Sequence, residues 1–221
     1  MQSNISLNAS KNSAIEINKV LKNTYMLLSM TLAFSAVTAG ISMAMGLPHG
    51  AALIMTLVSF GLLFVVNKKA DSASGFFWIF AFTGLMGASL GPMLNHYAAM
   101  PGGPALIMQA LGGTALIFFA LSGYALTSKK DFSFMGGFLM VGLIVAVVAM
   151  IANIFLQIPA LSLAISAAII MIMSGLILFD TSRIINGGET NYIRATVSLY
   201  LNIYNIFVHL LSLLGVLGGD D

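Results

Sequence analysis

Long apolar runs separated by short polar connections make up most of this 221-residue chain. A transmembrane helix needs about 20 predominantly apolar residues to cross roughly 30 Å of hydrocarbon. Seven runs meet or nearly meet this length: Thr24–Met45, His49–Val66, Ala73–Leu94, Ala105–Thr127, Phe134–Leu156, Ala160–Asp180 and Thr196–Leu217. Because lipid offers no partner to unpaired backbone groups, the pattern predicts an all-α polytopic membrane protein with seven transmembrane helices.

Composition agrees with this fold class and excludes several functions. Hydrophobic residues make up 59% of the chain and charged residues 7%, which lies outside the usual range of soluble domains. Cysteine is absent, which excludes disulfides, thiolate catalysis and cysteine-ligated metal. We expect a flexible polar tail over residues 1–23, a membrane domain over 24–217 and a short external tail over 218–221. The first tail has no apolar centre, so it is not a cleavable signal peptide.

The basic residues predict an orientation. They lie in the N-terminal tail or in alternate connections, at Lys11, Lys19, Lys22, Lys68, Lys69, Lys129, Lys130, Arg183 and Arg194. By the positive-inside rule the N-terminus is cytoplasmic, and the C-terminus, with Asp220 and Asp221, lies outside. An error of one in the number of spans would break this alternation.

Small residues mark one face of the third span. Gly84, Gly87 and Gly91 are spaced by three and four residues, so they share a helix face that a neighbouring backbone can approach closely. We interpret these glycines as packing residues. Pro92 follows them and is expected to kink or end the helix.

A stripe of polar side chains runs along the seventh span. Its members are Ser198, Asn202, Asn205, His209 and Ser212, which fall within an arc of about 80°. Polar groups in a bilayer face the protein interior or water, so we expect this helix at the centre of the bundle. Interhelical hydrogen bonding is the favoured role of Asn205, whereas His209 either packs in the same way or senses pH.

Asp180 is the only acidic residue inside or at the edge of a span. Intramembrane carboxylates are functional candidates. Burial favours the neutral form, and a nearby Arg183 or Arg194 favours the ionised form, so Asp180 could act as a proton-linked latch. The alternative is an interfacial residue that Arg183 caps. Asp180 is also the only candidate ligand for a metal, and no cofactor is expected.

The motifs of several enzyme classes are missing from the chain. There is no HExxH motif and no glycine-rich phosphate loop. An intramembrane protease with paired aspartates needs two carboxylates in the membrane, and this chain offers one. We therefore expect a protein that is not an enzyme.

Three segments resemble the BAX inhibitor-1 (TMBIM) family. Phe179–Thr181 and Leu199–Asn202 are similar to its paired C-terminal motifs, and Thr83–Pro92 is similar to its glycine-proline signature. The run Gly187–Tyr200 resembles the bacterial YccA-like members most closely. The resemblance extends over nearly the whole chain from about Asn18.

This family resemblance implies a seven-helix bundle with the last helix at its centre. It also implies a pH-sensitive calcium leak gated by two aspartates between the sixth and seventh helices. Asp180 matches the first aspartate, but Asn202 stands in place of the second. An Asp–Asn pair cannot show the coupled titration of two carboxylates, and it is a weaker site for a hard cation. A leak gated at Asp180 is therefore the alternative function.

Resemblance to the YccA-like members implies a different role, which we favour. These proteins bind the membrane-anchored AAA protease FtsH in the bacterial inner membrane and moderate its activity. The polar N-terminal tail offers a segment that such a protease could grasp, although an ordinary disordered leader would have the same composition. Besides the lipid bilayer we expect no nucleic-acid partner, and a monomer is favoured.

Overall fold

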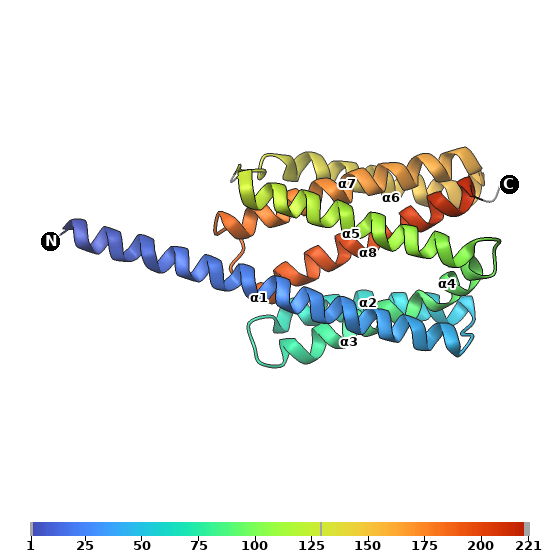
Figure 1. Ribbon diagram of the computed structural model, residues 1–221, viewed down its shortest axis with the longest axis horizontal. Helices are drawn as coiled ribbons and strands as arrows, with labels where there is room; N and C mark the ends of the chain where they lie inside the picture. The colour runs from blue at the N-terminus through green and yellow to red at the C-terminus, as the bar shows by residue number, and fades with distance from the viewer. Residues whose placement is uncertain (1, 129, 219–221) are drawn as a thin grey trace.

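The computed structural model describes residues 2–128 and 130–218. Over this part of the chain all regular secondary structure is helical (Figure 1). Lys129, Asp220 and Asp221, which entered the orientation argument, lie outside the described residues. The helices are α1 (Gln2–Ala44), α2 (His49–Lys69), α3 (Gly75–Ser89), α4 (Gly91–Ala98), α5 (Gly103–Ser128), α6 (Met135–Leu156), α7 (Pro159–Ile185) and α8 (Tyr192–Leu217).

Seven helical segments are long and apolar enough to cross a membrane, as predicted. The third of them, Gly75–Ala98, consists of α3 and α4 together. Its helix breaks at Leu90, and Pro92 occupies the first turn of α4. Proline fits there because the first turn of a helix needs no N–H donor from that position. The expected effect of Pro92 is confirmed.

The N-terminal segment differs from expectation. Residues 2–23, which we expected to be flexible, are helical and continue into the first span without a break. Nucleating a helix is costly, but adding residues to an existing one is not. A polar segment directly before a membrane-spanning helix can therefore remain helical. In Figure 1 the beginning of α1 projects beyond the rest of the bundle.

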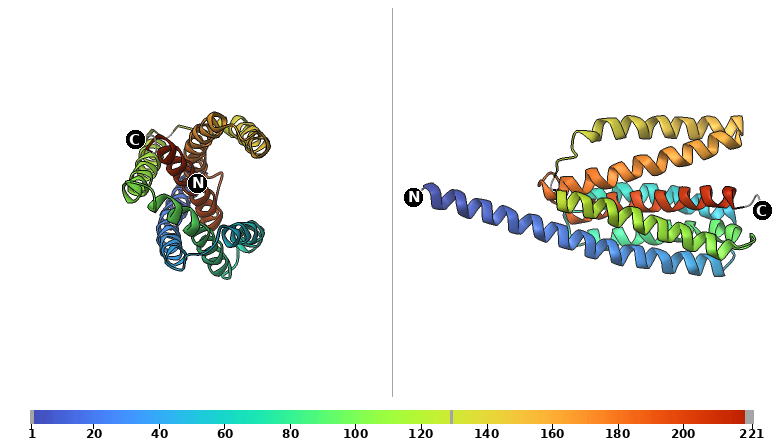
Figure 2. Two further views of the ribbon diagram at one scale, coloured as in Figure 1. Left: turned by 90° about the vertical axis from the view of Figure 1, so that its right-hand side faces the viewer. Right: turned by 45° about the horizontal axis from the view of Figure 1, so that its top comes forward.

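Helix α8 packs against helices on both of its sides. It contacts α1 and α3 on one side and α5 and α7 on the other, whereas α2 packs mainly on α3 and α6 on α7 (Figure 2). Leu199, Tyr200 and Ile206 of α8 are almost completely buried. In contrast, α6 exposes large apolar side chains such as Phe138 and Ile154, which suits contact with lipid.

The glycines of the third span lie against α1. A Cβ atom added at Gly87 would lie 2.2 Å from the backbone carbonyl oxygen of Ser35. One added at Gly84 would meet the ring of Phe34, and one at Gly91 the side chain of Ser42. The packing interpretation of these glycines is therefore confirmed.

Candidate functional site

The contact between Asp180 and Asn202 joins α7 to α8 inside the bundle. Asn202 Nδ2 donates a hydrogen bond of 2.8 Å to Asp180 Oδ2. The exposed fraction is 9% for Asp180 and 4% for Asn202. Because α7 continues to Ile185, Asp180 lies more than one turn before the end of its helix. The predicted contact is present, and the carboxylate is buried instead of lying at the interface.

The expected arginine partners of Asp180 are engaged elsewhere. Arg183 lies 3.7 Å from the Glu189 carboxylate, donates to the Gly188 carbonyl oxygen at 3.2 Å and covers the Phe179 ring. Long basic side chains near a helix end extend toward the polar boundary, which explains why Arg183 contacts the α7–α8 connection and forms no ion pair with Asp180.

Arg194 forms an ion pair with Asp71 of the α2–α3 connection. It lies in the first turn of α8, about 12 Å along the helix from Asn202. Arg194 and Asn202 therefore do not contact the same partner. Neither arginine forms an ion pair with Asp180 among the described residues, and the alternative in which Arg183 caps an interfacial Asp180 is wrong.

The remaining polar residues of α8 do not gather around Asp180. Asn205 Nδ2 donates to the Leu201 carbonyl oxygen of its own helix at 2.8 Å, and not to another helix as expected. His209 Nδ1 lies 3.2 Å from Ser166 Oγ of α7. His209 is two turns of α8 beyond Asn202. The stripe thus makes two separate polar contacts with α7, which are not one site.

Asn191, which the sequence reasoning missed, organises the beginning of α8. Its Oδ1 accepts hydrogen bonds from the backbone N–H groups of Ile193 and Arg194 at 2.9 and 3.1 Å, so it is the N-cap. Its Nδ2 donates to Asp71 Oδ1 at 2.7 Å and to the Ala70 carbonyl oxygen at 3.0 Å. An asparagine directly before a helix is a known capping signal, so this role could have been predicted.

Tyr200 is a second residue that the reasoning missed. Its hydroxyl group lies 2.7 Å from Ser35 Oγ of α1 and donates to the Thr83 carbonyl oxygen of α3 at 3.3 Å. The side chain is 1% exposed. It therefore links three helices, and nothing in the apolar pattern marks it.

The α5–α6 connection is fastened to α7 close to Asp180. Ser182 Oγ accepts a hydrogen bond from the Phe132 backbone N–H at 2.9 Å and donates to the Lys130 carbonyl oxygen at 3.3 Å. In the same connection, hydrogen bonds from the Ser133 side chain and backbone N–H hold the pKa of Asp131 below its usual range. These contacts fix the end of the bundle at which α7 terminates.

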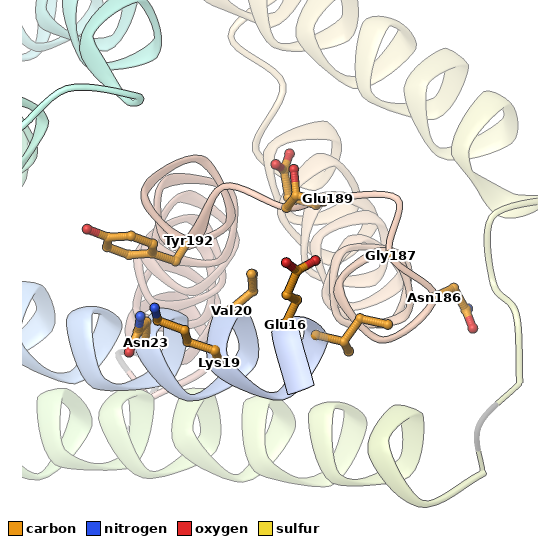
Figure 3. A pocket seen from close by; sticks show the side chains of 10 residues that line it. Glu16, Lys19, Val20, Asn23, Asn186, Gly187, Glu189 and Tyr192 are labelled. Atoms are coloured by element: carbon orange, nitrogen blue, oxygen red, sulfur yellow. The ribbon is translucent and has the colours of Figure 1, made fainter. Parts of the chain in front are cut away.

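A polar cavity lies at this end, between α1 and the α7–α8 connection (Figure 3). Its volume is about 510 Å³. Its lining includes Glu16, Lys19 and Asn23 of α1 together with Asn186 and Glu189 of the connection. Residues of α1 just before the predicted first span therefore lie beside the α7–α8 connection. This connection carries Glu189, the ion-pair partner of Arg183.

Metal-binding side chains do not cluster in the described residues. No group of three His, Asp or Glu side chains is placed to hold an ion in the part of the chain whose side chains the structure describes. At Asp180 the adjacent side chain is an amide, so a cation there would meet one carboxylate.

The chain matches a known protein family over most of its length. Residues 17–219 match the sequence model of the family described as "Inhibitor of apoptosis-promoting Bax1". The chain belongs to the Bax inhibitor family. This confirms the resemblance seen in the C-terminal motifs, one of which supplies Asp180 and the other Asn202.

Close relatives within the Bax inhibitor family are bacterial. The chain is 55% identical over 217 residues to the Escherichia coli K12 protein named "Modulator of FtsH protease YccA", covering 98% of each protein. The protein of E. coli O6:H1 with the same identity and coverage is named "Inner membrane protein YccA". A Vibrio cholerae relative, named an uncharacterized membrane protein, is 56% identical over 94% of this chain and 93% of its own length.

Proposed function

We propose that this chain is a regulatory protein of the bacterial inner membrane that binds the FtsH protease and moderates its activity. The observation that carries the proposal is the identity of 55% with the E. coli modulator of FtsH over 98% of both proteins. Because the match covers 98% of both proteins, the whole helix bundle of this chain corresponds to the E. coli protein. The membrane location follows from the seven apolar helices and from the naming of the E. coli O6:H1 relative.

Helix α1 provides a segment through which a protease could engage the chain. It starts at Gln2, whereas the apolar run predicted as the first span starts at Thr24. Residues 2–14 correspond to about 20 Å of helix, and Figure 1 shows this beginning of α1 projecting past the bundle. At the base of this extension lies the polar cavity with Glu16, Lys19 and Glu189. Both features can contact a partner outside the membrane.

The Asp180–Asn202 contact supports regulation over catalysis and over ion leak. An amide is neither a general acid nor a base, so this pair lacks the second titrating group that a two-carboxylate mechanism uses. It also lacks the repulsion between two carboxylates on which a proton-gated leak depends. The contact instead provides a buried polar joint between α7 and α8.

The proposal is tested by co-purification from E. coli membranes that lack the native YccA. The full chain should retain FtsH, and a variant without residues 2–14 should retain much less. A matched control replaces the same residues with a Gly/Ser segment of equal length, which separates loss of helix from loss of length. Failure of the full chain to retain FtsH, together with calcium flux in proteoliposomes, would favour the leak channel instead.

A further inference from the structure

A second cavity opens within the membrane-spanning part of the bundle. Its volume is about 470 Å³, and it lies between α1 and α5 with α8 as its floor. We call it the α1–α5 groove and define it by Leu32 and Ala36 of α1, Leu111 and Ala115 of α5, and Ile203 and Phe207 of α8. In Figure 1, α8 is visible in the space between α1 and α5. Neither Asp180 nor Asn202 lines it.

The walls of the groove suit an apolar occupant. None of its lining residues carries a charge. Among the polar ones, the Tyr200 hydroxyl group pairs with Ser35, and the Tyr204 hydroxyl group lies 3.1 Å from Ser89 Oγ. These hydroxyl groups therefore have partners within the protein. A polar ligand would lose its hydration without gaining equivalent hydrogen bonds, which is costly.

The groove is long, and one end is closed. At that end the Tyr25 hydroxyl group is hydrogen-bonded to Ser122 of α5, and the Tyr25 ring lies 6.0 Å from that of Phe118. The lining on α1 extends from Tyr25 to Gly40. This corresponds to about 22 Å of helix, a large part of the roughly 30 Å hydrocarbon core.

The size of the groove suits a lipid chain. The groove offers about 470 Å³, which lies within the range of small-molecule sites. An unbranched hydrocarbon chain is narrow enough to enter, and the bilayer supplies such chains along the open side. We propose that the α1–α5 groove binds one acyl chain of a bilayer phospholipid.

Photo-crosslinking of the full chain in lipid nanodiscs tests this proposal. The probe is phosphatidylcholine with a diazirine on one acyl chain, and adducts are mapped by peptide mass spectrometry. We expect adducts at groove residues such as Ala36 and Ala115 to exceed, per exposed residue, those on the outer face of α6. Equal frequencies on both surfaces would overturn the proposal.

Substitutions that fill the groove provide the second arm. Ala36→Phe with Ala115→Phe should remove most groove adducts, whereas Ala33→Phe with Ala120→Phe should leave them unchanged. Ala33 and Ala120 are exposed on the same two helices but do not line the groove. If the first pair lowers Tm more than the control pair, Ala115→Phe alone takes its place. Retention of groove adducts in a folded filling variant would contradict the proposal.

Discussion

Asn202 donates to the Asp180 carboxylate between α7 and α8, and both side chains are shielded from solvent. A buried polar group without a partner costs about 1–3 kcal/mol, so each residue of this pair stabilises the burial of the other. The pairing also bears on the proposed proton-linked latch. A carboxylate beside an amide can be ionised without meeting a second negative charge.

Asn202→Asp should make the chain more sensitive to pH than the parent. Two carboxylates at hydrogen-bonding distance cannot both be ionised without strong repulsion, so they share a proton at low pH and repel each other as the proton is lost. We expect calcium flux in proteoliposomes to change between about pH 5 and 8. Asn205→Asp is the control, because the Asn205 side chain bonds only to its own helix. Flux identical to that of the parent throughout this range would refute the latch role of Asp180.

At this scale the sequence predicted the Asp180–Asn202 contact but not the surroundings of Asp180. Helical periodicity shows which face of α8 carries Asn202, and the family resemblance implies that Asp180 is its partner. Periodicity does not show where a long, flexible side chain ends. Arg183 and Arg194 both reach polar groups at the end of the bundle, so proximity in sequence to Asp180 was misleading.

Among the helices, α1 and α3 approach each other closely where α3 carries Gly87. A Cβ atom at Gly87 would lie 2.2 Å from the Ser35 carbonyl oxygen and 2.4 Å from Thr38 Oγ1. The first neighbour is backbone, which cannot rotate away as the end of a side chain can. Any larger residue must therefore push the two helices apart.

Gly87→Ala should destabilise the bundle by about 1–3 kcal/mol, the usual cost of overpacking. Gly61→Ala is a matched control in α2, because no atom lies within 4 Å of its added Cβ. That change should be neutral or stabilising by about 0.5–1 kcal/mol, since alanine is the better helix former. Thermal unfolding in detergent, followed by circular dichroism, measures both. Equal Tm values for the two variants would show that α1 and α3 can separate without cost.

Helix number and type followed from the sequence, but several helix ends did not. Hydropathy marks the part of a helix that lies in lipid, and polar residues can continue the helix beyond it. Thus α7 extends past Asp180 to Ile185, and α8 starts at Tyr192. Capping residues were better markers: Gly187 has a positive φ of 74° after α7, and Asn191 caps α8.

For the whole molecule, the arrangement of helix ends agrees with a single orientation in the membrane. The α2–α3, α5–α6 and α7–α8 connections lie at the same end of the bundle as the N-terminal extension of α1 (Figure 1). Lys68, Lys69, Lys130, Arg183 and Arg194 lie in or beside these connections. From the positive-inside rule we expect this end to lie in the cytoplasm.

Reporter fusions test this orientation. A reporter placed after Lys130 should report the cytoplasm, and one placed after Asp221 should report the opposite side. An alkaline phosphatase fusion and a fluorescent protein fusion at each position provide complementary signals. Both positions on the same side of the membrane would contradict the orientation.

The two cavities were beyond prediction, because they depend on how the helices tilt and not on which residues are apolar. Ala36 and Ala115 look like any lipid-facing alanines in the sequence, yet they face the same groove. Likewise, nothing in residues 16–23 indicates that they lie beside the α7–α8 connection.

The rate at which reconstituted FtsH degrades a membrane substrate is the most direct test of the regulatory role. FtsH is placed in proteoliposomes with its substrate and increasing amounts of the full chain or of the chain without residues 2–14. Our account predicts that the full chain lowers the degradation rate in a saturable manner and that the truncated chain does so only weakly. A degradation rate that stays unchanged in the presence of excess, correctly folded full chain would contradict it.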